Sequence, residues 1–534
     1  MAKPLAYQPL TDFGVNGLNT QDNPATLDQT YLTSANNVVL RESGRISFRK
    51  GFKQKVVPTG TAIGSMIEHF DQSVTNGVNK IFASYGTSIY RIDFTAPNTA
   101  FPSSGADVKH TVANSTGNWQ FVNFNSRLHC FHAGVVPQRY DGSQSSGSRW
   151  AAHATDPASI STLFDPSCGM GFYGRIWCGG VAEAKDVVYY SNLLDGDDWT
   201  GGDTGFIDLK KVWGNDEIVA LAPFYGKLVI FGKENIAIYD SPQTVASLAL
   251  NEVIRGIGCI ARDSVQAIGD DLVFLSTTGL RSLARTTEKD KLPLTDLSVN
   301  IKDTIIRNIG QSTNVKSVYV ENEGIYIMTF TDKNITYIFD FKHITPQAAP
   351  RITTWSFETD REPSAMIYTE LYSGLLVGQK DGGVAGYEGY FDTDLAWVSS
   401  AASYTNSAFT ADICSIWIRM GDVAASILKK MILVLEGGSG ASLGLRWYKD
   451  FSMNSSSTTQ IALAPATTGT TALWGASTSL YGSAKYTPIY GLEEYKTALT
   501  GSAKHLKINM SIVSNGYDVS VQDLAIISKQ GKIR

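Results

Sequence analysis

Cysteines, secretion signals and long apolar runs are all scarce or missing in this sequence of 534 residues. The five cysteines are odd in number and irregularly spaced, so we expect reduced core residues rather than a disulfide framework. The start has no apolar signal core, and no stretch reaches transmembrane length, which predicts a soluble protein that stays in a cytoplasm or leaves it without a secretion signal. The formal net charge of −5 is mild and does not indicate general attraction to nucleic acid or to an anionic membrane.

Glycine and aromatic residues are abundant by comparison. The chain has 49 Gly against 17 Pro, together with 24 Tyr and 23 Phe. Glycine turns between aromatic and β-branched runs are typical of an all-β protein. Hydrophobic residues make up 43% of the chain, enough to fill several cores, and the length predicts two to four domains.

A pattern of paired apolar runs repeats seven times along the middle of the chain. Each repeat has a short apolar run, a turn, and a second run that ends in an aromatic or apolar residue. These final residues are Ile92, Tyr140, Tyr190, Tyr239, Leu283, Phe339 and Tyr387, at intervals of 44 to 56 positions. A repeat of roughly 40 to 50 residues that carries β-strands is typical of a β-propeller, with one blade per repeat. We therefore predict a propeller of six or seven blades; stacked β-sandwiches are the alternative.

Two of these repeats contain continuous apolar runs, at residues 228–231 and 272–275. Propeller blades pack face to face, so the middle strands of a blade are covered on both sides. Such strands are apolar throughout rather than alternating between apolar and polar residues. The two runs therefore favour the propeller over the sandwiches.

The pattern changes on either side of the repeats. Residues 1–57 are predicted to form an N-terminal arm or platform segment, residues 58–399 the propeller, and residues 400–534 a C-terminal β-sandwich-like domain. The third prediction rests on longer apolar stretches that read as strands, at residues 413–418, 430–435, 443–448, 506–512 and 524–527.

Charge is divided along the chain in the same way. Residues 1–57 have a net charge of +3, residues 58–399 of −12 and residues 400–534 of +4. An acidic middle between basic ends suggests electrostatic contact between the ends and other surfaces. The candidate assembly contacts are a basic cluster in the first segment: Arg41, Arg45, Arg49, Lys50, Lys53 and Lys55.

A search for catalytic and metal-binding patterns gives no strong candidate. The sequence has no phosphate-binding loop, no G-x-S-x-G nucleophile elbow and no HExxH motif. In His129-Cys130-Phe131-His132, Cys130 and His132 share one face of a predicted strand and could begin a metal site, but core or rim residues are the favoured interpretation. Residues 195–199 (DGDDW) have features of a calcium loop or an Asp box, yet the motif occurs once, which favours a solvated turn with a packed Trp. We therefore predict no catalytic, cofactor-binding or metal-binding residues, and a protein that is not an enzyme.

Several segments carry a family resemblance when they are taken in order. The Asn-Val pair Asn37-Val38 is followed by an Arg-x-Gly ending at residues 49–51. Further along the chain, two stretches of the repeat region, 188–232 and 256–280, belong to the same resemblance. In this order the segments resemble the tail nozzle proteins of short-tailed bacteriophages, a family also called tail tubular protein B or packaged-DNA stabilisation protein. The resemblance covers the repeat region well and the C-terminal domain only by type.

The resemblance implies a structural virion protein of the tail, assembled in the host cytoplasm. Such nozzles are homo-hexameric rings below the adaptor that joins them to the portal, and they retain packaged DNA and conduct it during ejection. For this chain it implies adaptor or portal ring proteins and tail fibre or spike proteins as partners. Duplex genome DNA would pass through the lumen without sequence-specific binding, and neither a cofactor nor membrane insertion is expected. A propeller enzyme that degrades glycans and a partner-binding scaffold or adhesin are the alternatives.

Overall fold

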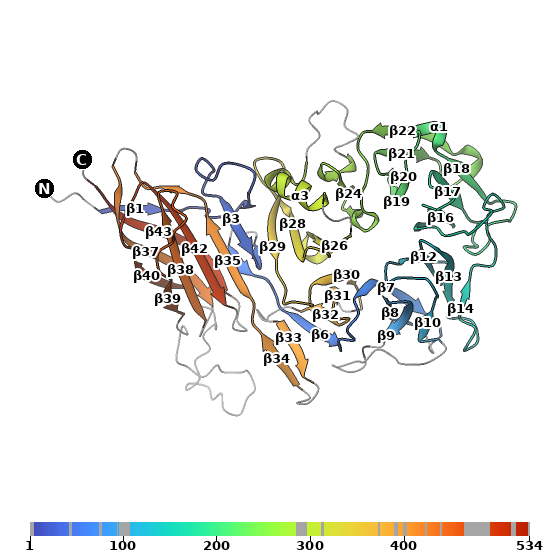
Figure 1. The fold of residues 1–534 in the computed structure, drawn as a ribbon, viewed down its shortest axis with the longest axis horizontal. Coiled ribbons are helices and arrows are strands. Elements are labelled where there is room, and N and C mark those ends of the chain that lie inside the picture. Colours follow the sequence, from blue (N-terminus) through green and yellow to red (C-terminus); the bar gives the residue numbers. More distant parts are fainter. Residues whose placement is uncertain are drawn as a thin grey trace, which may run out of the picture. The chain divides into compact units, whose positions relative to one another are not determined.

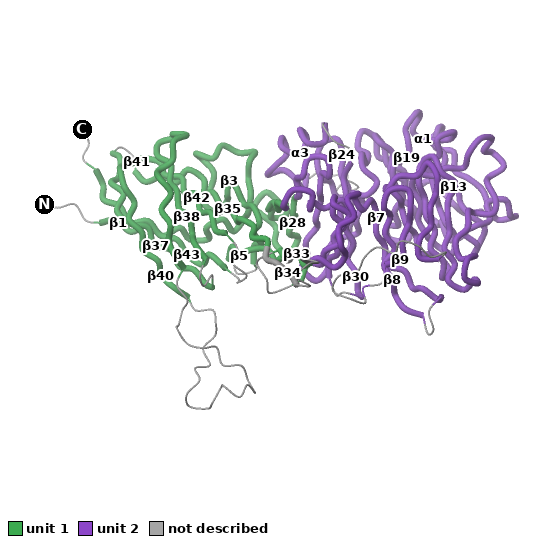
Figure 2. Tube along the Cα trace, turned by 60° about the horizontal axis from the view of Figure 1, so that its bottom comes forward, with its two compact units in different colours: residues 1–53, 337–356, 387–534 green, residues 54–336, 357–386 purple. Residues whose placement is uncertain are grey.

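The computed structural model describes most of the chain and divides it into two compact units (Figure 2). Unit 1 comprises residues 1–53, 337–356 and 387–534, and unit 2 comprises residues 54–336 and 357–386. The described residues are 5–41, 45–73, 77–92, 94, 107–284, 296–310, 314–371, 374–388, 394–398, 403–421, 424–437, 441–463, 492–513 and 519–531.

Unit 2 is built from short antiparallel strands that follow one another in the chain. They are β7 (Ile63–Asp71), β8 (Val78–Tyr85), β9 (Ser88–Ile92), β10 (Lys109–Thr111), β11 (Gln120–Phe124), β12 (Arg127–His132), β13 (Val135–Asp141), β14 (Trp150–Ala152), β15 (Cys168–Phe172), β16 (Arg175–Gly179), β17 (Val187–Tyr190), β18 (Gly205–Asp208), β19 (Ile218–Phe224), β20 (Lys227–Gly232), β21 (Asn235–Asp240), β22 (Ala249–Arg255), β23 (Gln266–Ile268), β24 (Asp271–Ser276), β25 (Gly279–Ser282), β26 (Val315–Val320), β27 (Ile325–Phe330), β30 (Pro363–Thr369), β31 (Gly374–Gln379) and β32 (Val384–Tyr387).

These strands form the blades of a β-propeller (Figure 1). Four sheets have four strands each: β7–β10, β11–β14, β15–β18 and β19–β22. The three-stranded sheet β23–β25 and the strands β30–β32 form two further blades, and the hairpin of β26 and β27 lies between β23 and β30. The contact of β30 with β7 closes the ring, so the sheets surround a common axis with the first strand of each blade innermost.

Six of the seven predicted repeats coincide with strand pairs of this ring, and the sixth in order, β27–β28, runs from unit 2 into unit 1. The seven pairs of apolar runs fall on β8–β9, β12–β13, β16–β17, β20–β21, β24–β25, β27–β28 (Ile335–Ile344) and β31–β32. The predicted all-β propeller fold is therefore confirmed.

The middle strands of the blades are covered on both faces, as the apolar runs indicated. On β20, Leu228 and Ile230 belong to one buried cluster, which includes Trp177 of β16. The alternate residues Val229 and Phe231 belong to another cluster, which includes Phe274 of β24. All four β20 side chains are fully buried. A strand between two blades needs an apolar residue at every position, and this requirement explains the continuous run.

Unit 1 contains longer strands from distant parts of the sequence. They are β1 (Leu5–Pro9), β2 (Gly17–Leu18), β3 (Tyr31–Asn36), β4 (Val38–Leu40), β5 (Ile46–Phe48), most of β28, β29 (Pro350–Trp355), β33 (Asp394–Val398), β34 (Ser403–Ser407), β35 (Thr410–Ser415), β36 (Ile418–Arg419), β37 (Ser426–Gly437), β38 (Ser442–Lys449), β39 (Thr459–Ala462), β40 (Leu492–Ala498), β41 (Ser502–Ala503), β42 (His505–Val513) and β43 (Val519–Gln530). Strand β6 (Phe52–Val56) crosses the division between the units.

The strands of unit 1 form two main sheets. One has the order β4-β5-β43-β37-β40, with β1 paired to β43, and the other contains the run β28-β29-β2-β3-β35-β42-β38-β39. Buried and more exposed residues alternate along β42, where Leu506, Ile508, Met510 and Ile512 are buried. Each sheet of a sandwich buries one face in this way, so the C-terminal strands have the predicted β-sandwich-like character.

The division of the chain differs from the three predicted segments. The N-terminal segment and the C-terminal strands belong to one unit, because β3 pairs with β35 and β5 pairs with β43. Unit 1 also takes residues 337–356 from within the predicted propeller span. Pairing between strands hundreds of residues apart leaves no local pattern in the sequence, so the two segments look independent until the structure joins them.

Helices are short and few in the described part of the chain. The two α-helices are α1 (Lys210–Trp213) and α3 (Lys302–Ile309), and the 3₁₀ turns are η1 (Val245–Ser247), η2 (Arg262–Ser264), η3 (Val299–Ile301) and η4 (Glu321–Glu323). None of the helices in these residues has the length and apolar character needed to cross a membrane.

Candidate functional site

Asn37-Val38 and the Arg-x-Gly ending at residues 49–51 form the N-terminal signature of the family resemblance. The arginine of this ending, Arg49, lies in the interior of unit 1. The side chain of Arg49 is fully buried, and its Nη1 and Nη2 atoms donate to the two carboxylate oxygens of Asp394, each at 2.9 Å. The guanidinium also lies over the ring of Phe409, 3.8 Å from its centroid. This planar, bidentate arrangement is available to Arg and not to Lys. Arg49 is therefore an internal connector between residues far apart in the chain.

The signature's asparagine belongs to the same cluster. Asn37 has a φ of 56°, a left-handed conformation that Asn tolerates better than most residues. Its Oδ1 atom accepts hydrogen bonds from Arg49 Nε at 3.0 Å and from the Ser356 backbone N–H at 2.9 Å. Its Nδ2 atom donates to the Thr410 carbonyl at 2.8 Å. We call Asn37, Arg49, Ser356, Asp394 and Thr410 the signature cluster; it joins all three segments of unit 1.

The other predicted assembly residues lie nearer the surface. Arg45 forms an ion pair with Glu436 at 2.6 Å, and 40% of its side chain is exposed. Lys53 lies 3.7 Å from Glu388, while Arg41 donates to Ser47 and Lys50 lies over the ring of Tyr387. Lys55 is half-buried. Because Arg49 is occupied inside unit 1, the predicted assembly role now rests on the other five side chains.

A group of charges lies among the inner strands of the propeller, where the side chains of Lys316, Arg262 and Asp263 are 9%, 12% and 25% exposed. Arg262 donates to both carboxylate oxygens of Asp263, at 2.7 and 3.0 Å, and Lys316 Nζ lies 2.5 Å from the same carboxylate. Arg262 and Lys316 also both donate to the side-chain oxygen of Asn118. Burial alone raises the pKa of Asp263, but the two cations outweigh it and hold that pKa well below its usual range.

A small cavity remains beside these charges. Its volume is about 250 Å³, and it is lined by the inner strands β7, β11, β26 and β30 together with η2 and β23. A second cavity of about 530 Å³ is also lined by Gly64 and Lys316. These volumes are no larger than those of small-molecule pockets, about 300–1,000 Å³, so neither space holds a nucleic-acid duplex. The axis of one propeller is therefore not a passage for DNA.

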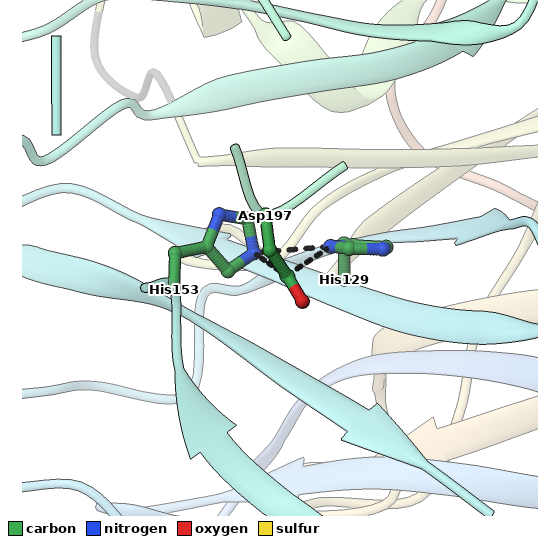
Figure 3. Close-up of side chains that lie close together, drawn as sticks. All are labelled: His129, His153 and Asp197. Atoms are coloured by element: carbon green, nitrogen blue, oxygen red, sulfur yellow. Dashed lines mark hydrogen bonds and ion pairs between the residues drawn. The ribbon is translucent and has the colours of Figure 1, made fainter. Parts of the chain in front are cut away.

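A second buried polar group joins two neighbouring blades of unit 2 (Figure 3). His129 lies on β12, His153 directly follows β14, and Asp197 lies between β17 and β18. His129 Nδ1 and His153 Nε2 form a hydrogen bond of 3.0 Å, and each of these nitrogens lies 3.6 Å from Asp197 Oδ1. The side chains of both histidines are 0% exposed and that of Asp197 is 8% exposed. We call these three residues the His-His-Asp cluster.

Arginines and a tryptophan surround the His-His-Asp cluster. Arg139 Nε and Arg127 Nη1 contact the other carboxylate oxygen of Asp197, Oδ2, at 2.7 and 3.1 Å. Trp199 Nε1 donates to His153 Nδ1 at 3.1 Å. By contrast, Asp197 Oδ1 has no hydrogen-bond partner among the described residues. A buried carboxylate oxygen without a partner is costly, so this atom needs an explanation.

Burial sets the protonation of the cluster. Together with the charges of Arg127 and Arg139, it lowers the pKa of His129 to about 3, and it lowers the pKa of His153 well below its usual value. Burial also raises the pKa of Asp197 to about 6, against the opposing effect of the arginines. Both imidazoles are therefore neutral near pH 7.

The two motifs noted in the sequence, residues 129–132 and 195–199, predicted only part of the His-His-Asp cluster. Cys130 and His132 are both buried, as the favoured interpretation had it. The Trp of residues 195–199 is packed as predicted, since Trp199 is 3% exposed, but the turn is not solvated throughout because Asp197 is 6% exposed. No short spacing relates His129 to His153 and Asp197, so no local pattern predicts that these residues meet.

Comparison with known proteins does not identify the chain. No protein-family model matches the sequence, and no curated protein is significantly similar to it.

Proposed function

We propose that this chain is a structural subunit of the tail nozzle of a short-tailed bacteriophage. In this proposal six copies form a ring below the portal and its adaptor, which retains packaged DNA and conducts it during ejection. Fibre or spike proteins attach to the same tail. The protein performs no catalysis in this role.

The observation that carries the proposal is the position of the signature residues. Asn37 and Arg49, which carry the N-terminal resemblance to tail nozzle proteins, meet in the signature cluster although they are separated in sequence. Arg49 reaches Asp394 there, across 345 positions of the chain. A motif whose residues hold a β platform together has a structural purpose, which suits a ring subunit better than an enzyme.

The centre of a single propeller is too narrow for DNA, which restricts the route that DNA can take through the proposed ring. Arg262, Asp263 and Lys316 lie among the inner strands of the propeller, and the cavities beside them are too small for a duplex. In the proposed ring, DNA therefore runs through a lumen enclosed by several subunits. The net charge of −12 over residues 58–399 supports a lumen that repels phosphate and lets DNA slide, because many Lys or Arg contacts would instead bind it in a salt-dependent manner.

Electron microscopy of the purified full-length chain tests this proposal directly. We expect six-fold rings with a lumen wide enough for duplex DNA, and weak binding of duplex DNA at physiological salt. Particles that stay monomeric at all concentrations and degrade polysaccharides would instead support the enzyme alternative. Closed rings that bind duplex DNA tightly and in a salt-sensitive manner would contradict the sliding lumen.

A further inference from the structure

The His-His-Asp cluster has the composition and spacing of a metal site. Two imidazole nitrogens and one carboxylate oxygen are a common ligand set for divalent transition metals, zinc among them. Around a tetrahedral zinc ion with ligands at about 2.0–2.2 Å, neighbouring ligand atoms lie roughly 3.3–3.5 Å apart. The separations here, 3.0, 3.6 and 3.6 Å, bracket that range. We propose that His129 Nδ1, His153 Nε2 and Asp197 Oδ1 bind one divalent transition-metal ion, with zinc as the expected occupant.

The free carboxylate oxygen supports this assignment independently of the spacing. Asp197 is nine-tenths buried, and its Oδ2 atom is held by Arg127 and Arg139, whereas its Oδ1 atom points at the two imidazoles without a hydrogen bond from any described residue (Figure 3). At 3.6 Å, neither imidazole nitrogen is close enough to be a donor. A cation between the three atoms would supply the missing partner.

The balance of charge around the cluster points the same way. Three carboxylates, those of Asp141, Asp195 and Asp197, face two guanidinium groups, those of Arg127 and Arg139. The network therefore holds one carboxylate more than it holds guanidinium groups, although Asp195 is 49% exposed. Neutral imidazole is also the form that binds a metal ion.

The ion would connect two blades. His129 and His153 belong to the sheet β11–β14, whereas Asp197 belongs to the segment that precedes the last strand of the sheet β15–β18. Because the ligands are buried and come from separate sheets, the role of the metal is structural. This inference does not depend on the proposed nozzle function.

The hydrogen bond from Trp199 to His153 is incompatible with a metal ion bound to His153. A neutral His153 that binds a metal through Nε2 carries its proton on Nδ1, and that nitrogen then cannot accept the hydrogen bond from Trp199 Nε1. Binding therefore has to break this hydrogen bond, and also the one that joins His153 Nε2 to His129 Nδ1 in the metal-free protein. The substitution Trp199→Phe removes the competing donor and keeps an aromatic ring, so it should tighten metal binding.

The test is a titration of the metal-free full-length protein with Zn²⁺, read by metal analysis after dialysis and by the thermal shift. We expect about one zinc per chain and a higher unfolding temperature, since a ligand that binds only the native state stabilises it. His129→Asn, His153→Gln and Asp197→Asn should each weaken zinc binding by more than about 100-fold, because even outer contacts of a metal ligand are worth roughly 10- to 100-fold.

His132→Gln is the matched control, because His132 is a buried histidine on the same strand and lies outside the cluster. It should bind one zinc, like the wild-type protein. Circular dichroism of each metal-free variant identifies any that fails to fold, and Trp199→Phe then supplies an independent test. Failure of the folded wild-type protein to bind Zn²⁺ and Co²⁺ would overturn the proposal. So would retention of zinc by all folded ligand variants, or weaker zinc binding in Trp199→Phe.

Discussion

The two units of this chain connect their strands in opposite ways. In most sheets of unit 2, neighbours in the sheet are neighbours in the sequence: β11 to β14, for example, fall within residues 120–152 and form one blade, although β32 pairs with the distant β6. In unit 1, Leu32 of β3 pairs with Ser415 of β35, and Leu5 of β1 pairs with Lys529 of β43. Local pairing closes small loops at low entropic cost, whereas distant pairing must hold most of the chain in place first. We therefore expect unit 2 to form early and to survive damage that destroys unit 1.

Truncation is the most severe way to test that difference. Removing residues 400–534 takes away β35 and β43, the partners of β3 and β5. We predict that the remaining chain keeps a folded propeller but loses unit 1 entirely, and with it the ability to form a ring. Light scattering measures assembly and circular dichroism measures retained strand content. A truncated protein that still forms the full ring would show that unit 2 alone carries assembly.

Like the truncation, the substitution Arg49→Ala should destabilise unit 1 and leave unit 2 intact. It removes the buried guanidinium and leaves the carboxylate of Asp394, 15% exposed, without its bidentate partner. Breaking a buried ion pair by removing one side typically costs about 3–5 kcal/mol. We predict a fall of this size in the unfolding free energy of unit 1, with the denaturant transition of unit 2 unchanged. Equal losses in both units would mean that they do not unfold separately.

Acid should weaken unit 2 through Asp263. Its pKa is lowered in the folded protein by Arg262 and Lys316, so the stabilisation is fully present above the unfolded pKa of about 3.9 and is lost as the pH falls through the lower folded value. The effect is on the order of 2 kcal/mol. Other acids titrate in the same range, so the quantity to measure is the difference in unfolding free energy between the wild-type protein and Asp263→Asn. We predict that this difference shrinks between pH 5 and pH 2; a constant difference would contradict the assignment.

The smallest effect is expected at Arg45. This residue pairs with Glu436, as Arg49 pairs with Asp394, but 40% of the Arg45 side chain is exposed. Exposed pairs contribute less than about 1 kcal/mol. Arg45→Ala should therefore leave the stability of unit 1 almost unchanged in a urea titration, which makes it the control for Arg49→Ala. If Arg45 is an assembly contact, the same variant should weaken the ring while its subunits stay folded.

The sequence predicted the fold where strand pairing is local. The run at 228–231 and its partner on β21 lie close together in the chain, so their spacing and composition were enough to identify a blade. The C-terminal strands were also found, since Leu506 to Ile512 alternates as a half-buried strand does. Their union with β3 and β5 could not be found, because a pairing across more than 350 residues has no periodicity to detect.

The candidate sites could not be predicted in full either, because their residues also come from distant segments. Arg49 was singled out for its charge, as a surface contact, but a charge pattern does not reveal that Asp394 lies opposite and makes burial tolerable. His129 was noticed beside Cys130 and His132, whereas the structure places it with His153 and Asp197. In both cases the decisive partner comes from a distant segment, and one sequence alone does not supply it.

The pairing of β1 with β43 has a consequence for how the protein is made. A ribosome adds about 5–20 residues per second, so roughly half a minute to two minutes separate the synthesis of Leu5 from that of its partner Lys529. During this interval β1 has no strand to pair with, while the propeller segments have already emerged. A nascent chain that stops before β43 therefore contains the complete blades of unit 2 but lacks a strand that unit 1 needs. Translation itself would thus keep prematurely terminated products out of any assembly that depends on unit 1.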